Sequence, residues 1–155
     1  MEISPLAPER FPQLGDIRGV SLATHTAEIK YRDREDIMLA VLDPGATAAG
    51  VFTQSMTAGA PVLVCREHLT SGGPRALIVS SGNSNAFTGR TGMQHCDMMC
   101  QSIADAINCS PKQVFIASTG VIGELLPIER ITDSVPILVQ NLSASTWFQA
   151  ASSIL

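Results

Sequence analysis

Short apolar runs separated by polar turns divide this chain into predicted strands. Apolar stretches of four to six residues, continuous or alternating, are typical of strands in a packed sheet. The most continuous run, Ile-Met-Leu-Ala-Val-Leu at 37–42, predicts a strand that is covered on both faces. Further strands are predicted at residues 19–24, 28–31, 48–53, 61–65, 76–80 and 114–117.

Apolar residues at helical spacing predict the helices. Residues 91–108 are the clearest case, with Thr91 as the expected N-cap and an apolar stripe formed by Cys96, Met99, Cys100, Ile103 and Ile107. A second helical pattern covers residues 127–142, and Pro136 within it is expected to kink or split the helix. Shorter helical segments are expected at 66–69, at the Ser-Pro-Lys-Gln capping box of 110–113, and after Ser145.

Two polar motifs each follow a predicted buried strand directly. The first is a loop rich in glycine and asparagine at 81–89, and the second is a Ser-Thr-Gly turn at 118–120. The motifs flank the 91–108 helix, so they lie at one edge of a sheet if this helix crosses over between parallel strands. The sequence therefore favours one shared site over two unrelated turns.

The chemistry of these motifs leaves two alternatives open. A strand end that presents a hydroxyl and backbone N–H groups has the donors of an oxyanion hole, and a glycine lets a substrate oxygen approach the amide. The same Ser-Thr-Gly residues also suit an ordinary tight turn between a strand and a helix. The 81–89 loop is likewise either a functional loop or a turn ordered by its asparagine side chains.

Composition and charge narrow the class of protein. The chain has 155 residues, of which 45% are apolar and 15% charged, enough for one folded domain with a core. Its net charge is −4 and it has no basic patch, which argues against nucleic acid as a partner. No apolar run reaches the length of a membrane span and the N-terminus lacks a secretory pattern, so we expect a cytoplasmic protein without a membrane partner.

The cysteines and histidines are expected to be structural. The cysteines have no C-x-x-C spacing, and His95 would point about 100° away from Cys96 on a helix, so we expect reduced thiols and no metal. The chain also lacks a nucleophile elbow and a phosphate-binding fingerprint. No evident Ser or Asp partner accompanies the three histidines, His25, His68 and His95.

A charge-stabilising motif without a nucleophile is what the first part of an enzyme would contain if its nucleophile came later. The apolar stretch 147–155 has no polar tail, so we expect the chain to be a piece of a longer polypeptide. Several motifs in order resemble the bifunctional ornithine acetyltransferase family, also called glutamate N-acetyltransferase. The most specific is Ala-Ser-Thr-Gly-Val-Ile-Gly-Glu at 117–124, and the others lie at 19–24, 49–53, 60–62, 76–79 and 81–89.

The resemblance implies an α/β sandwich of the self-processing DmpA/ArgJ type, with residues 1–155 as the N-terminal part of a single catalytic domain. Family members cut themselves before a threonine, which becomes the nucleophile of a complementary C-terminal (beta) chain. That threonine moves an acetyl group from N-acetylornithine, or in some members from acetyl-CoA, to glutamate. Thr119 and Gly120 match the pair that stabilises the oxyanion. A heterotetramer of two alpha and two beta chains is implied, and no cofactor or metal.

The sequence departs from the family pattern in places. Ser80 and Ser84 stand where the family usually has Asn and Ala, and Leu125 where it often has Pro. The family's Thr-Thr-Asp-Thr motif and self-cleavage site would follow Leu155, so the nucleophile and the main substrate-binding residues are expected beyond this chain. Two alternatives remain: a non-enzymatic fragment or binding-only relative that needs a partner chain, and a nucleotide-binding α/β domain built on 81–91.

Overall fold

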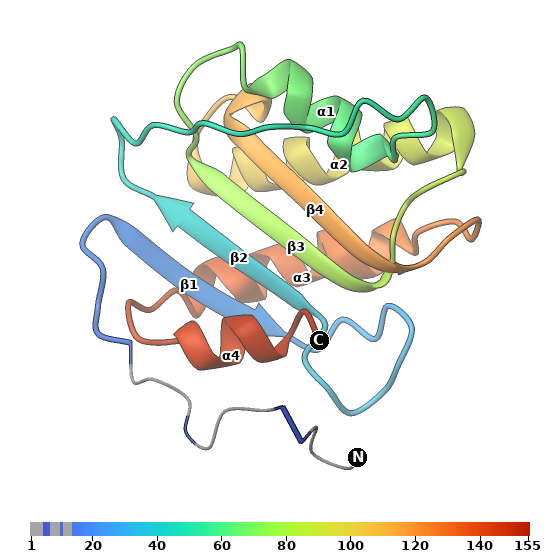
Figure 1. Cartoon of the computed structure of the whole chain (residues 1–155). Coiled ribbons are helices and arrows are strands. Elements are labelled where there is room, and N and C mark those ends of the chain that lie inside the picture. Colours follow the sequence, from blue (N-terminus) through green and yellow to red (C-terminus); the bar gives the residue numbers. More distant parts are fainter. Residues whose placement is uncertain (1–4, 7–9, 11–13) are drawn as a thin grey trace.

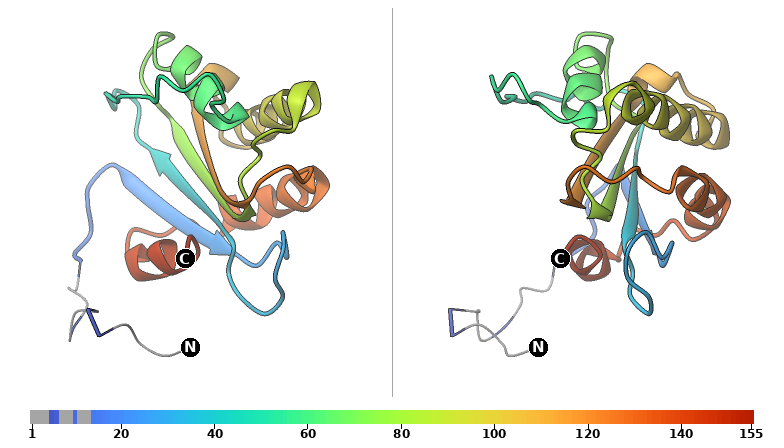
Figure 2. Two further views of the ribbon diagram at one scale, coloured as in Figure 1. Left: turned by 45° about the vertical axis from the view of Figure 1, so that its right-hand side comes forward. Right: turned by 90° about the vertical axis from the view of Figure 1, so that its right-hand side faces the viewer.

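The computed structural model describes residues 5, 6, 10 and 14–155 of the chain. Its centre is a four-stranded sheet in the order β1-β2-β3-β4. β1, β2 and β3 pair antiparallel, whereas β3 and β4 pair parallel. Helices α1, α2 and α3 cover one face of the sheet, and α4 lies against the other face at β1 (Figures 1 and 2).

The four strands follow the strongest apolar runs of the sequence. They are β1 (Val20–His25), β2 (Ile37–Leu42), β3 (Ala76–Asn83) and β4 (Val114–Val121). The first four residues of β2 are buried, in keeping with the prediction of a strand covered on both faces. β3 and β4 run three or four residues further than predicted, because their polar ends continue the parallel pairing. The expected turn at 118–120 was therefore wrong.

The helices are α1 (Ala60–His68), α2 (Gly89–Ile107), α3 (Ile128–Gln140) and α4 (Trp147–Ser152). The predicted stripe of α2 is confirmed, since all of its members except Ile107 are fully buried. The capping box is confirmed in the short 3-10 helix η1 (Pro111–Gln113). The Ser110 hydroxyl accepts from the N–H of Lys112, and the Gln113 side-chain oxygen accepts from the N–H of Ser110. None of the helices in the described part of the chain is long and apolar enough to cross a membrane.

Three predictions about the helical regions differ from the structure. Residues 61–65 form α1 instead of a strand, since Pro61 suits a first helical turn and the buried residues recur at helical spacing. The N-cap of α2 is Thr88 and not Thr91. Pro136 does not split α3, because it lies on the exposed side of the helix, where water can bind the carbonyl that loses its N–H partner.

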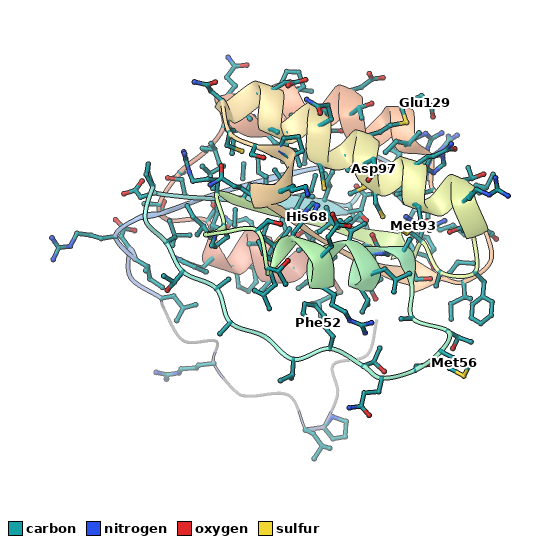
Figure 3. The ribbon with its side chains drawn as sticks, turned by 90° about the horizontal axis from the view of Figure 1, so that it is seen from above. Phe52, Met56, His68, Met93, Asp97 and Glu129 are labelled. Carbon is teal, nitrogen blue, oxygen red and sulfur yellow. The ribbon has the colours of Figure 1, made fainter. Side chains whose placement is uncertain are left out.

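Two further predicted strands, at 28–31 and 48–53, are not part of the described sheet. Residues 48–53 run as an extended segment outside α1 (Figure 3). Arg66 of α1 holds this segment by donating to the Thr53 carbonyl at 2.6 Å, and its guanidinium lies 5.9 Å from the centre of the Phe52 ring.

Two apolar clusters fill the space on the two faces of the sheet. The larger one lies between the sheet and α1, α2 and α3, with Ile37, Leu39, Ile78 and Ile103 completely buried. The smaller one joins Leu22, Met38 and Ala40 of the opposite face to Ala150 of α4. The sheet is therefore fully covered on its first face, and on the second face mainly over β1 and β2.

Asp36 organises the segment between β1 and β2. Its carboxylate is completely buried and accepts from the backbone N–H groups of Ala27 at 2.7 Å and Ile29 at 2.6 Å. Its own carbonyl accepts from the N–H of Ser81 on β3 at 2.8 Å. Residues 28–31 were predicted to form a strand, but the N–H at the centre of this range, that of Ile29, binds a side chain instead of a neighbouring strand.

We predict that Asp36→Ala lowers the free energy of unfolding by about 2–5 kcal/mol, because it leaves two buried N–H groups without an acceptor. Urea denaturation followed by circular dichroism measures the change. Asp133→Ala, on the exposed side of α3, serves as the control and is expected to change stability by less than about 0.5 kcal/mol. An Asp36→Ala variant as stable as the control would contradict this role.

Candidate active site

The two polar motifs meet at the end of the parallel pair. Ser81 of β3 is in register with Thr119 of β4, and Gly82 is in register with Gly120. α2 forms part of the connection between these strands, so the prediction that both motifs share one edge of a sheet is confirmed (Figure 1). Parallel strands joined by a crossover helix commonly place their functional groups at this edge.

The pleat of β4 separates the two hydroxyls of the Ser-Thr-Gly motif. Ser118 points to the helical face, where its hydroxyl lies 2.9 Å from that of Ser80. Successive side chains of a strand point to opposite faces. Thr119 is exposed and lines a cleft on the opposite face together with Gly120. Of the two hydroxyls, that of Thr119 is therefore the one available to a ligand in this cleft.

Gly120 is required by the backbone of the neighbouring strand. Its φ is +129°, and a Cβ at this position would lie 2.3 Å from the carbonyl carbon of Gly82 and 2.6 Å from the nitrogen of Asn83. Any side chain would therefore separate β3 from β4 at the site. From the sequence, this glycine was expected to let a substrate oxygen approach the amide; the close contact between the two strands is visible only in the structure.

The loop after β3 is ordered by its asparagine side chains, as one of the two alternatives expected. The side chain of Asn85 is completely buried, donates to the Gly92 carbonyl at 3.0 Å and accepts from the Thr88 hydroxyl at 2.8 Å. Ser84 ties the loop to β4 by donating to the Val121 carbonyl through both its N–H and its hydroxyl. The ends of β3 and β4 are thus held rigidly beside each other.

The cleft beside Thr119 and Gly120 has a volume of about 530 Å³. Its other walls come from distant parts of the chain: Tyr31, Arg34, Ser81, Gly82, Ile154 and Leu155. Arg34 donates to the Ser81 hydroxyl at 3.0 Å, and its guanidinium lies 4.8 Å from the centre of the Tyr31 ring. Arg34 was not among the site residues predicted from the sequence, because nothing near it in the chain places it beside β3.

The cysteines and histidines lie apart from this cleft. All four cysteines are free, and burial raises the pKa of Cys96 and of Cys100 to about 12, so both remain protonated thiols at neutral pH. His68, at the end of α1, has its Nδ1 atom 2.8 Å from the Val114 carbonyl (Figure 3). Among the residues that the structure describes, no group of three or more His, Cys, Asp or Glu side chains could hold a metal ion.

The chain is similar in sequence to a known family and to several of its members. The model of the ArgJ family matches residues 21–155. The arginine biosynthesis bifunctional protein ArgJ of Gluconobacter oxydans is 46% identical over 155 residues, which are 100% of this chain and 36% of that protein. The protein of the same name from Ruegeria pomeroyi is 47% identical over 156 residues, covering 99% of this chain and 38% of the relative.

Two solved structures share the fold. Ornithine acetyltransferase from Mycobacterium tuberculosis, crystallised with ornithine, superposes with a TM-score of 0.84 at 32% identity, covering 88% of this chain and 75% of the other. The bifunctional protein ArgJ from Bacillus halodurans gives 0.78 at 30% identity, with 90% and 75% covered. The predicted fold of the DmpA/ArgJ type is thereby confirmed. This chain spans just over a third of the length of the curated relatives.

We predict that Gly120→Ala lowers the free energy of unfolding by more than about 3 kcal/mol, because it combines a strained φ with a clash against the backbone of β3. Gly45→Ala is the matched control: its φ is +93°, but nothing lies within 4 Å of the added Cβ. The control isolates the conformational strain, about 1–2 kcal/mol. Equal losses in the two variants, measured by urea denaturation, would show that the close approach costs nothing.

Proposed function

This chain belongs to the ArgJ family, and from that premise we propose that it is the N-terminal part of an acetyltransferase of arginine biosynthesis. The proposed enzyme moves an acetyl group from N-acetylornithine to glutamate, and acetyl-CoA is a possible second donor. A threonine hydroxyl attacks the acetyl carbonyl, the C–N bond breaks, and ornithine leaves with its amine. The amine of glutamate then attacks the acyl-threonine and releases the enzyme. No cofactor or metal takes part.

Thr119 and Gly120 are assigned to the oxyanion of both tetrahedral intermediates. The observation that carries this assignment is their place at the rigid ends of two parallel strands, both exposed to one cleft. The Thr119 hydroxyl and the Gly120 N–H would donate to the developing negative charge. Fixed donors stabilise a transition state because they need no reorganisation when the charge forms.

The nucleophile is assigned to a complementary C-terminal chain that completes a single catalytic domain with residues 1–155. We propose an assembly of two alpha and two beta chains. The greater length of the relatives supports a second part, since this chain covers only 36% of the first of them. Ile154 and Leu155 line the cleft, so a segment joined to Leu155 would begin beside Thr119. The four free thiols fit the reducing cytoplasm, where we place the enzyme.

We predict that residues 1–155 alone do not transfer acetyl groups, because the proposed nucleophile is not among them. Transfer from N-acetylornithine to radiolabelled glutamate measures the activity. Addition of the complementary chain should restore it. Activity of the isolated chain would show that its own residues supply the nucleophile. A complete enzyme that binds the amino acids but never transfers acetyl groups would favour a binding-only relative.

We predict that Thr119→Ala in the complete enzyme lowers kcat about a hundred- to a thousand-fold, the effect of losing one oxyanion donor of about 2.7–4 kcal/mol. KM should change little, because a ground-state carbonyl accepts more weakly than an oxyanion. Thr119→Ser keeps the hydroxyl and should retain much of the activity.

Thr70→Ala, in the exposed turn that follows α1, is the control for this experiment. Self-cleavage is scored separately by gel electrophoresis, because it forms an oxyanion of its own. A correctly processed Thr119→Ala enzyme with the kcat of the control would reduce Thr119 to a structural residue of the strand.

A further inference from the structure

Two side chains of α1 bind the backbone of β4, against which this helix packs (Figure 1). The Cys65 thiol donates to the Ile116 carbonyl at 3.1 Å and accepts from the Ile116 N–H at 3.3 Å. One helical turn later, Nδ1 of His68 lies 2.8 Å from the Val114 carbonyl, and this nitrogen carries the proton because a carbonyl only accepts. α1 thus binds β4 through the groups that a neighbouring strand would use.

These bonds hold the edge of β4 that faces away from β3. The backbone groups of successive residues point alternately to the two edges of a strand. The Val121 carbonyl accepts from the N–H of Ser84, in the loop after β3, so the odd-numbered residues of β4 face β3. The even-numbered residues Ile116 and Gly120 therefore face the outer edge. The Gly120 N–H, one of the two proposed oxyanion donors, lies on the edge that Cys65 holds.

The Cys65 thiol is part of the packing between α1 and β4. Cys65 and Ile116 are both buried in the larger apolar cluster. Burial raises the pKa of the thiol, so at neutral pH it keeps the proton that it donates to the Ile116 carbonyl. Both hydrogen bonds of the thiol are therefore present at neutral pH.

Bonds on both edges fix the rotation of β4 about its own axis, whereas bonds on one edge leave this rotation free. The strand is continuous from Ile116 to Gly120 and is paired with β3 throughout this range. A rotation at Ile116 would therefore turn the Thr119 hydroxyl and the Gly120 N–H as well. Such a change matters for catalysis, because a misplacement of about 1 Å can cost about a hundred-fold in rate.

We propose that Cys65 is a positioning residue for the oxyanion donors: its thiol holds the outer edge of β4 and thereby places the Thr119 hydroxyl and the Gly120 N–H. The proposal rests on the proposed function for the reaction that these donors serve. Cys65 acts through β4 and not on the substrate, so its loss should weaken binding of the transition state more than binding of the substrate. The expected signature is a lower kcat at a nearly unchanged KM.

The test compares variants of Cys65 in the complete enzyme, with folding checked by urea denaturation. Cys65→Ala should lower kcat about five- to fifty-fold with little change in KM. Cys65→Ser keeps a donor and an acceptor and should recover much of the kcat. Val64→Ala is the matched control, because it removes two buried methyl groups from the same helix and no hydrogen bond to β4. This control should keep the kcat of the wild type.

A double-mutant cycle tests whether Cys65 acts through Thr119. In the Thr119→Ala enzyme there is no hydroxyl to position, so the loss of kcat caused by Cys65→Ala should be at least about three-fold smaller than in the wild type. A Cys65→Ala enzyme with the kcat of the Val64→Ala control overturns the proposal. Losses that multiply without any coupling between the two positions also overturn it.

Hydrogen exchange of the β4 amides gives a readout that needs no turnover. The Ile116 amide should exchange about three- to ten-fold faster in Cys65→Ala than in Val64→Ala, because it has lost one hydrogen bond. Equal exchange in the two variants contradicts the hold of Cys65 on β4 and overturns the proposal. If the complete wild-type enzyme transfers no acetyl groups, the proposed function is wrong, and faster exchange in Cys65→Ala still supports the hold on β4.

Discussion

The close approach of two backbones at Gly82 and Gly120 is the constraint on which the candidate site depends. Gly120 adopts a positive φ and has no Cβ, and there is no space for one beside Gly82. β4 can therefore stay paired with β3 to its last residue. The pairing carries Thr119 past the end of the apolar core and into the cleft. A bulkier residue would part the strands at the point where their donors must keep a fixed geometry.

A buried carboxylate is the second element on which the cleft depends. The Asp36 carboxylate accepts from backbone N–H groups of its own segment, and its carbonyl accepts from an N–H of β3. These bonds order the connection between β1 and β2 so that it forms one wall of the cleft. The wall brings Tyr31 and Arg34 beside Ser81. The same hydrogen bonds thus contribute to the stability of the fold and to the position of the charged side chain in the cleft. Loss of these bonds would therefore change both.

The proposed catalysis by fixed donors depends on how the cleft is closed. Donors help most where they surround the transition state and are screened least by water. The cleft is lined by the polar ends of β3 and β4. On this face of the sheet, α4 packs mainly over β1 and β2 (Figure 2). In the proposed enzyme the complementary chain would close this side and bring the nucleophile, so that each part supplies what the other lacks.

Local sequence determined much of this protein. The runs at 37–42, 76–80 and 114–117, the stripe of α2 and the capping box of η1 were predicted because their period or spacing depends on neighbours along the chain. The order of the two polar motifs around one helix also sufficed to predict their meeting. The run at 61–65 was misjudged because five apolar residues fit a strand or a helix equally. Pro61 in the first turn and packing against β4 favour α1.

The tertiary structure alone decided which groups share the cleft. Arg34 is 47 residues from Ser81, yet their side chains are hydrogen-bonded, and no periodicity records such a contact. The tertiary structure also decided that a glycine is needed at position 120 because the backbone of β3 lies so close. It decided that the hydroxyl of Thr119, and not that of Ser118, faces the cleft. The physical reason is common to all three. Sequence patterns report the face of an element on which a residue lies, whereas the partner on that face is set by how elements distant in the chain pack together.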